Sequence, residues 1–256
     1  YAHHPKYWID VVEPKKTDIL YRNLDEDKRV LLESYRRTSG VMNYVRLING
    51  AFSTKPTSEW EEPDPIPWQA IMGREGNIYE NYDEFMDAEG HRDWPSIAVY
   101  FYRDEWIMGD IEYQQALFEE IYKHQYNPII FYGQYGSNPR VGIPNMKLSM
   151  NHLFGKNEFP FDVLINTCKF SFQSLGAQTL EELKLQDVPI VQGYTIYMDE
   201  KSWAENPQGV TPLDVNLSIS QPELDGVIQG GVVACQTYDE RGHYVYLPVK
   251  ERIAAI

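Results

Sequence analysis

The stretch SIAVYFY at residues 96–102 decides the fold class. It is almost continuously apolar and rich in β-branched and aromatic residues, as strands buried on both faces are. Similar runs follow it: NPIIFY at 127–132, FDVLINT at 161–167 and VPIVQGY at 188–194. The intervals between these runs are long enough for helices. Strands that alternate with helices predict an α/β fold, a mostly parallel open sheet with flanking helices on both faces.

Helical patterns occupy these intervals. Tyr113, Leu117 and Ile121 recur at every fourth position and predict one buried helix face, with Asp110 placed to cap the helix. Residues 179–185 predict a short helix before the last of these strands.

The pattern changes after the last of these strands. Residues 214–219 and 227–237 look extended, and DERG at 239–242 is a typical turn sequence. We therefore expect the chain to end in an antiparallel hairpin at the margin of the sheet.

A helical segment precedes the sheet. Apolar residues recur at helical spacings over residues 25–52, and Gly40 interrupts the pattern, so a pair of helices is expected. Prolines with acidic neighbours then fill residues 53–67, where a helix cannot continue. These boundaries divide the chain into a helical segment at 1–60, a linker and irregular segment at 61–95, and a Rossmann-like α/β domain at 96–256.

The composition excludes several classes of protein. The 256 residues include 23 Lys and Arg against 38 Asp and Glu, a net charge of -15. Such a chain has no field that attracts a nucleic-acid backbone or an anionic membrane surface. No run approaches the roughly 18 apolar residues of a membrane helix, and no signal-peptide pattern opens the chain. Cys168 and Cys235 lie in apolar runs and are expected to be buried thiols.

The ends of the chain suggest a longer parent. It starts at Tyr1 without a methionine, and residues 250–256 resemble the start of a helix. We therefore expect an internal part of a longer polypeptide, in which an anchor or signal could lie outside these residues.

Ligands of an open parallel sheet bind beyond the carboxyl ends of its strands. These ends correspond to residues 103–110, 133–140, 167–176 and 194–203. The glycine-rich run GQYGSNPRVG at 133–142 matches neither the phosphate-loop nor the dinucleotide-binding pattern. The histidines are scattered without metal-ligand spacing and no nucleophile elbow is present, so we expect neither a metal centre nor a hydrolase.

The run QPELDG at 221–226 carries a pair of acids. Pro222 is expected to stop a strand and to leave Glu223 and Asp225 in the following loop, with Gly226 free to adopt a positive φ. The carboxylates either share a functional site or are solvated in an ordinary turn.

Several runs, in order, resemble the core of the cobaltochelatase and magnesium chelatase large subunits. GVMNYVRLIN at 40–49, SIAVYFYRDEWIMGD at 96–110 and FDVLINTCKFS at 161–171 are similar to segments of that family. The longest match runs from DVPIVQGY through SWAENPQGVTPLD to QPELDG, at 187–226. The resemblance spans residues 40–256.

The chain also departs from the family pattern. Gln221 stands where an aliphatic residue is usual, Lys169 where a glycine is usual, and Asn43 where Glu-Asn is common. These departures bear on the exact activity more than on the fold.

The resemblance implies an enzyme, a chelatase that forms nitrogen–metal bonds, of which this chain is one part and by itself inactive. In that family the large subunit binds a tetrapyrrole and assists insertion of a divalent metal, cobalt or magnesium, while AAA+ ATPase subunits use ATP. The implied partners are therefore the tetrapyrrole, the AAA+ subunits and the remainder of the large subunit. No cofactor is expected in this part of the protein.

The chemistry indicates why acids matter. Insertion removes the pyrrolic N–H protons, so a carboxylate near the ring can act as base and attract the hydrated cation. By resemblance, Glu223 takes this role, Asp225 supports it, and Asp214 supports both without contacting the ring.

Other side chains are implied to bind the substrate. Arg103 pairs either with a tetrapyrrole propionate or with Asp110. Phe170, Phe172 and Trp203 either lie against the macrocycle or belong to the core.

Alternatives stay open. A distant member of the family could run the proton transfers backwards and remove iron from haem. A module of another class would bind or dock a tetrapyrrole without chemistry. We expect a cytoplasmic location for an inserting enzyme and a periplasmic or membrane-anchored one for a haem dechelatase.

Overall fold

The computed structural model describes residues 24–134, 143–155, 158–171, 180–181, 183–240 and 242–256. The chain divides into a compact unit at 1–67 and a larger one at 68–256. None of the described helices has the length and apolar character needed to span a bilayer.

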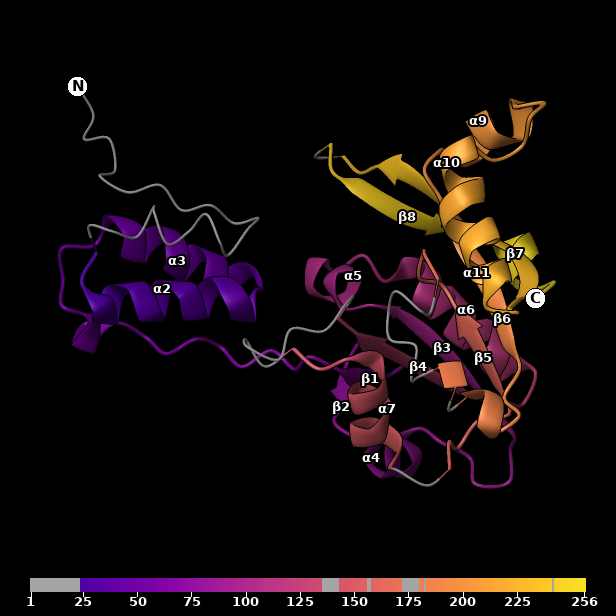
Figure 1. Cartoon of the computed structure of the whole chain (residues 1–256), viewed down its shortest axis with the longest axis horizontal. Coiled ribbons are helices and arrows are strands. Elements are labelled where there is room, and N and C mark those ends of the chain that lie inside the picture. The colour runs from indigo at the N-terminus through magenta and orange to yellow at the C-terminus, as the bar shows by residue number, and fades with distance from the viewer. Residues whose placement is uncertain (1–23, 135–142, 156–157, 172–179, 182, 241) are drawn as a thin grey trace. The chain divides into compact units, whose positions relative to one another are not determined.

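The first unit is a pair of helices (Figure 1). α2 (Glu26–Thr38) ends just before the chain turns at Gly40, and α3 (Val41–Phe52) begins directly after it, as the interrupted periodicity predicted. The proline-rich segment that follows contains the short 3-10 helix η1 (Thr57–Glu59). Among the described residues of this unit, the buried apolar side chains are Leu32, Tyr35 and Leu47.

We expect Gly40→Ala to destabilise this helix pair by about 1–3 kcal/mol. Gly40 has φ 86° and ψ 150°, a conformation that essentially only glycine adopts. An added Cβ would also collide with the side chain of Ile66. Amide hydrogen exchange of α2 and α3 measures the loss, and Asn49→Ala at an exposed position of α3 is the control. Equal protection in the two variants would contradict this expectation.

Among the described residues, the second unit is built on one sheet in the order β2-β1-β4-β3-β5-β6-β7-β8. The five strands from β4 to β7 in this order are parallel, whereas β1, β2 and β8 are antiparallel to their neighbours. The bounds are β1 (Ala70–Met72), β2 (Ile78–Tyr79), β3 (Ser96–Tyr102), β4 (Asn127–Gly133), β5 (Val163–Asn166), β6 (Ile190–Ile196), β7 (Ile228–Tyr238) and β8 (Tyr244–Pro248). The predicted α/β sheet and its terminal hairpin are confirmed.

Helices connect these strands (Figure 1). Their bounds are α4 (Tyr82–Ala88), α5 (Arg103–Met108), α6 (Glu112–Lys123), α7 (Met146–Phe154), α9 (Glu200–Glu205), α10 (Pro212–Asp214), the π-helix η3 (Val215–Ser220), α11 (Gln221–Leu224) and α12 (Lys250–Ile253). Residues 180–181 and 183–185 are also helical, in agreement with the predicted short helix.

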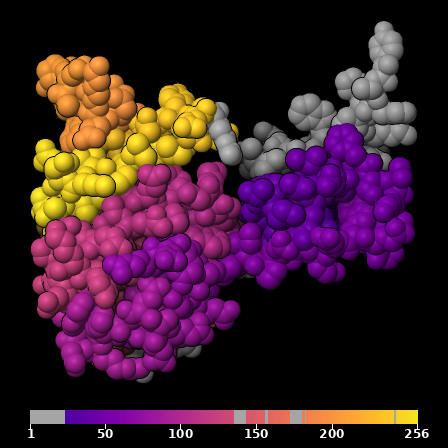
Figure 2. Space-filling model, turned by 180° about the vertical axis from the view of Figure 1, so that it is seen from behind, coloured from indigo at the N-terminus to yellow at the C-terminus, as the bar shows by residue number. Residues whose placement is uncertain are grey.

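The helices pack on the sheet through one continuous apolar core. α6 buries Tyr113, Leu117 and Ile121, the face that the sequence predicted. The chain passes from β3 to β4 in one direction and from β4 to β5 in the other, so right-handed connections place α6 and α7 on opposite faces. α9, in orange, projects beyond the yellow C-terminal segment (Figure 2).

Residues 214–219 are helical, so the prediction of an extended segment was wrong. The alternation in VNLSIS resembles a half-buried strand, but the hydroxyl of Thr211 accepts the N–H of Asp214 at 3.1 Å. Pro212 follows in the first helical turn, where proline is favoured. α10, η3 and α11 then continue without a break, so Pro222 lies within a helix and does not end a strand.

Asp110 also differs from expectation. α6 starts after Ile111, and the carboxylate of Asp110 accepts the N–H of Tyr246 in β8 at 3.0 and 3.2 Å. This contact ties the hairpin to the loop that follows α5. Residues 61–95, which we expected to be irregular, contain β1, β2 and α4, and the boundary between the units follows Pro67.

Candidate functional site

The strand order points to one end of the sheet. β3 has β4 on one side and β5 on the other, so the direction of winding reverses between β3 and β5. At such a reversal the loops after the strands diverge and form the usual ligand crevice of an open α/β sheet. The residues that follow β3 and β5 are therefore the first candidates for chemistry.

Glu105 lies in α5, which begins directly after β3. Its Oε2 atom accepts hydrogen bonds from the hydroxyl of Tyr113 and from Nε2 of Gln114, both at 2.7 Å. The same hydroxyl lies 3.1 Å from Oγ1 of Thr167, which follows β5. Glu105, which follows β3, is thus linked through Tyr113 to Thr167, which follows β5 on the other side of the reversal point.

The carboxyl group of Glu105 exchanges protons near neutral pH. Burial is the largest cause and raises its pKa to about 8. The hydrogen bond from Tyr113 and the charge of Lys169 lower this pKa, whereas the charges of Asp110 and Asp104 raise it. A carboxyl group with such a pKa, close to a strand end, is typical of acid–base sites.

A buried network fixes the chain after β5. Nδ2 of Asn166 donates to Oε1 of Gln192 at 2.8 Å, and both amides donate to the carbonyl of Cys168, at 3.1 and 2.9 Å. Thr167 donates its N–H and its hydroxyl to the carbonyl of Tyr100, both at 3.0 Å. These bonds fix the backbone at Thr167 and Cys168 and so limit the conformational freedom of the next residue, Lys169.

Lys169 is only 4% exposed. Its Nζ lies 3.6 Å from Oδ1 of Asp214 and 3.1 Å from the centre of the Tyr197 ring. In the part of the chain that the structure describes, Nζ makes no hydrogen bond. Burial lowers the pKa of Lys169 to about 8, although Asp214 and Glu105 act in the opposite direction. The amine is therefore partly neutral near pH 8.

Asp214 is fully buried, and its carboxylate accepts several hydrogen bonds. The hydroxyl of Thr211 donates to Oδ2 at 2.7 Å, and the N–H of Tyr197 lies 3.3 and 3.4 Å from the carboxylate oxygens. The π-helix η3 begins at the next residue, and π-helical turns are frequent at functional sites. These bonds hold the carboxylate of Asp214 beside Nζ of Lys169.

The acids of QPELDG occupy different environments. Glu223 lies in α11 and is exposed, whereas Asp225 is buried and accepts a hydrogen bond from Oγ of Ser171 at 3.1 Å. Gly226 has a positive φ of 80°, as predicted. Asp225, at the end of α11, therefore contacts the loop after β5, whereas Glu223 faces solvent.

Arg103 and Asp110 also lie at this end of the sheet. The guanidinium of Arg103 is buried and lies 4.4 Å from the centre of the Trp68 ring. Asp110, which we weighed as its partner, accepts the N–H of Tyr246. A role of Arg103 toward a propionate stays a prediction.

The aromatic candidates have separate surroundings. Phe170 has a positive φ of 75°, rare outside glycine, and its N–H donates to the carbonyl of Leu217 at 2.7 Å. Strain of this kind is concentrated at functional sites. Trp203 packs against a small apolar cluster, with the guanidinium of Arg252 5.6 Å from its ring centre. Phe172 lies outside the described residues.

Glu105, Tyr113 and Lys169 were not predicted as site residues. The sequence pointed to the segments 103–110 and 167–176, which supply Glu105 and Lys169. The available signal was a charged residue placed soon after a buried strand. Both cysteines are free and buried, as predicted.

Metal sites were not expected, and the described residues contain no group of three or more His, Cys, Asp or Glu that could hold a metal ion. Most of the glycine-rich run at 133–142 lies outside the described residues.

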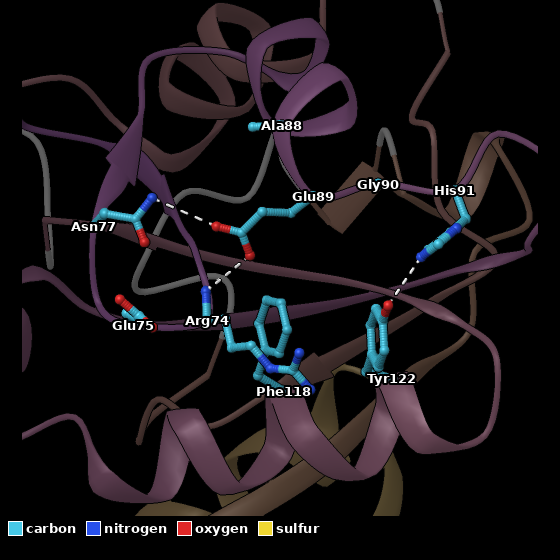
Figure 3. A pocket seen from close by; sticks show the side chains of 9 residues that line it. All are labelled: Arg74, Glu75, Asn77, Ala88, Glu89, Gly90, His91, Phe118 and Tyr122. Atoms are coloured by element: carbon cyan, nitrogen blue, oxygen red, sulfur yellow. Dashed lines mark hydrogen bonds between the residues drawn. The ribbon is translucent and has the colours of Figure 1, made fainter.

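A separate pocket lies beside β1 (Figure 3). Its lining consists of Arg74, Glu75, Asn77, Ala88, Glu89, Gly90, His91, Phe118 and Tyr122. Glu89 accepts the N–H of Arg74 at 3.0 Å and Nδ2 of Asn77 at 3.4 Å. His91 Nε2 lies 3.0 Å from the hydroxyl of Tyr122. These groups pair with one another and fasten the turn between β1 and β2, so we regard the pocket as structural.

Fold and site together define an α/β protein with a buried acid–base cluster at the reversal point of a parallel sheet. Residues 33–256 match the model of the CobN/Magnesium Chelatase family, and the chain belongs to that family. The resemblance seen in the sequence is confirmed.

Individual proteins are similar to this chain over most of its length. An uncharacterized protein of Methanocaldococcus jannaschii is 30% identical over 221 residues, 81% of this chain. The aerobic cobaltochelatase subunit CobN of Pseudomonas aeruginosa is 22% identical over 178 residues, 66% of this chain. The catalytic subunit of cobaltochelatase from Mycobacterium tuberculosis has the same fold, with a TM-score of 0.61 and 21% identity over 89% of this chain.

All of these proteins are much longer. The chain spans 18% of the archaeal protein, 13% of the Pseudomonas subunit and 18% of the Mycobacterium subunit. It therefore corresponds to one part of each.

Proposed function

We propose that the chain is part of a tetrapyrrole metal-chelatase large subunit. In this proposal it binds the tetrapyrrole and assists insertion of cobalt or magnesium, in a complex whose AAA+ subunits use ATP. Membership of the family supports the proposal, as do the names of two relatives, which are cobaltochelatase subunits. The observation that carries it is the ionisable cluster of Glu105, Lys169 and Asp214 at the strand ends, since metal insertion is a proton-transfer reaction.

The reaction needs proton acceptors because a free-base porphyrin carries two pyrrolic protons. Glu223 is exposed in α11, the last helix before β7, and is free to meet a ring from solvent. Its carboxylate takes one proton, and Asp225 orders the adjoining loop through Ser171. Arg103 and Asp110 follow the carboxyl end of β3, and Phe170 follows that of β5.

Binding is tested by following the Soret band during titration of the complete polypeptide that contains this chain. Free-base protoporphyrin, haem and hydrogenobyrinic acid diamide are the probes. We expect saturable binding of at least one of them, and the one that binds identifies the ligand. Failure of all three to bind would overturn the proposed function.

We expect Glu223→Gln to leave tetrapyrrole affinity unchanged and to slow metal insertion by about 10²-fold. The change removes a base and keeps the shape of the side chain. Single-turnover insertion by the complete protein with its ATP-using partners measures the rate. Glu251→Gln, an exposed glutamate of α12, is the matched control. Equal rates for both variants would instead favour a docking module without chemistry of its own.

A further inference from the structure

The proposed reaction releases two protons, and Glu223 accounts for one. We propose that Glu105 is the second proton acceptor of this site and that Lys169 is a positioning residue that tunes it. The inference rests on the proposed function and deepens it, because it assigns the path of the second proton.

The hydrogen bonds of Glu105 leave one oxygen available. Tyr113 and Gln114 both donate to Oε2. No described residue donates to Oε1 of Glu105. This oxygen is also not one of the fully buried polar atoms that lack a partner. Glu105 itself is only partly buried. Oε1 is therefore the atom that can accept a proton from a ligand at the strand ends.

The surroundings of Glu105 fit both of its protonation states. The ionised carboxylate is met by the hydroxyl of Tyr113 and the amide N–H of Gln114. Oε1 of Gln114 is buried without a partner. A half-turn of that amide brings this oxygen toward Glu105, where it can accept the proton of the neutral acid.

Lys169 is the cation that acts on Glu105. It approaches from the loop after β5, whereas Asp104 and Asp110 approach from the loop after β3 and carry negative charge. The other titratable groups around the two residues are Asp214, Tyr197, Tyr113 of α6, Tyr246 of β8 and the thiol of Cys168. The ammonium of Lys169 thus opposes the aspartates and lowers the pKa of Glu105, which burial raises to about 8.

The proposed step conserves atoms and charge. As the divalent metal forms its bonds to the ring nitrogens, one N–H bond breaks toward the carboxylate of Glu223. The other breaks toward Oε1 of Glu105. The metal bonds to the ring nitrogens, its two positive charges replace those of the two protons lost, and both glutamates become neutral acids. No oxidation or reduction takes place.

The test is the pH dependence of single-turnover insertion by the complete protein, with free-base protoporphyrin as the probe because its ring loses two N–H protons. The wild-type rate is expected to rise with pH through about 8, as Glu105 ionises. Glu105→Gln should slow insertion by about 10²-fold and remove this rise. Lys169→Met should move the rise to higher pH, because the carboxylate loses its cation. Glu112→Gln, an exposed glutamate of α6, should behave as wild type.

An infrared difference spectrum between the wild type and Glu105→Gln supplies a readout that does not depend on activity. A protonated carboxylic acid band from Glu105 is expected at about pH 7. Its absence would overturn the inference, as would a Glu105→Gln enzyme with the wild-type rate and pH profile. Loss of tetrapyrrole binding by the wild type would instead overturn the proposed function, and this inference with it.

Discussion

Asp214→Asn is expected to lower the free energy of unfolding of the sheet domain by about 3–5 kcal/mol at neutral pH. The substitution keeps the shape of the side chain but removes the charge 3.6 Å from Nζ of Lys169. Lys169 makes no hydrogen bond within the described residues, so its buried ammonium would lose its nearest counter-charge. Urea unfolding of the wild type and the variant, followed by the fluorescence of the sheet domain, measures the difference.

The reverse substitution should cost less. Lys169→Met leaves Asp214 with the donors of Thr211 and Tyr197, so we expect a loss of only about 1–2 kcal/mol. The double variant should be more stable than Asp214→Asn alone, because neither charge remains. Additive losses in the double variant would show that the two side chains do not interact.

The parallel sheet could be predicted because its strands carry their own signal. β3 and β4 are buried on both faces, so their sequences are continuous apolar runs that need no knowledge of their neighbours. β1 and β2 have three and two residues, too few for any periodicity, and became visible only through their pairing with β4 and with each other. The extent of the domain was therefore harder to predict than its class.

The helical segment after β6 shows where a local pattern misleads. Residues 215–220 alternate apolar and polar side chains as a strand does, yet they form a π-helix. Its start depends on the cap of Thr211 and on Pro212, which lie before the alternating run. The loop after β5 contacts it through the N–H of Phe170, a contact that no local pattern contains.

The acid–base cluster could not be predicted because its members are distant in sequence. Glu105, Tyr113, Lys169 and Asp214 come from four segments, and their chemistry depends on burial. A lysine in a sequence gives no sign that it will be only 4% exposed. The rule that ligands bind beyond the carboxyl ends of parallel strands predicted the segments. Only the tertiary structure shows which of their side chains lie together.

The stability of the sheet domain should pass through a minimum near pH 8. The pKa of Glu105 is raised from 4.5 to about 8, so its contribution is fully present below 4.5 and is lost as the pH rises through 8. The pKa of Lys169 is lowered from 10.5 to about 8, so its contribution is present above 10.5 and is lost as the pH falls through 8. Both groups therefore disfavour folding most strongly around pH 8.

On each side of this minimum the free energy of unfolding should change by about 2–3 kcal/mol, allowing for solvent screening of the partly exposed Glu105. Urea unfolding over a series of pH values measures it. Glu105→Gln should flatten the limb on the acid side and Lys169→Met the limb on the alkaline side, while Glu112→Gln should change neither. Ordinary carboxylates titrate alike in all of these proteins, so the differences between variants isolate the two groups. Equal profiles for wild type and Glu105→Gln would mean that this carboxyl is already ionised in the folded protein at neutral pH. Its pKa would then be too low for it to accept a proton in the proposed reaction.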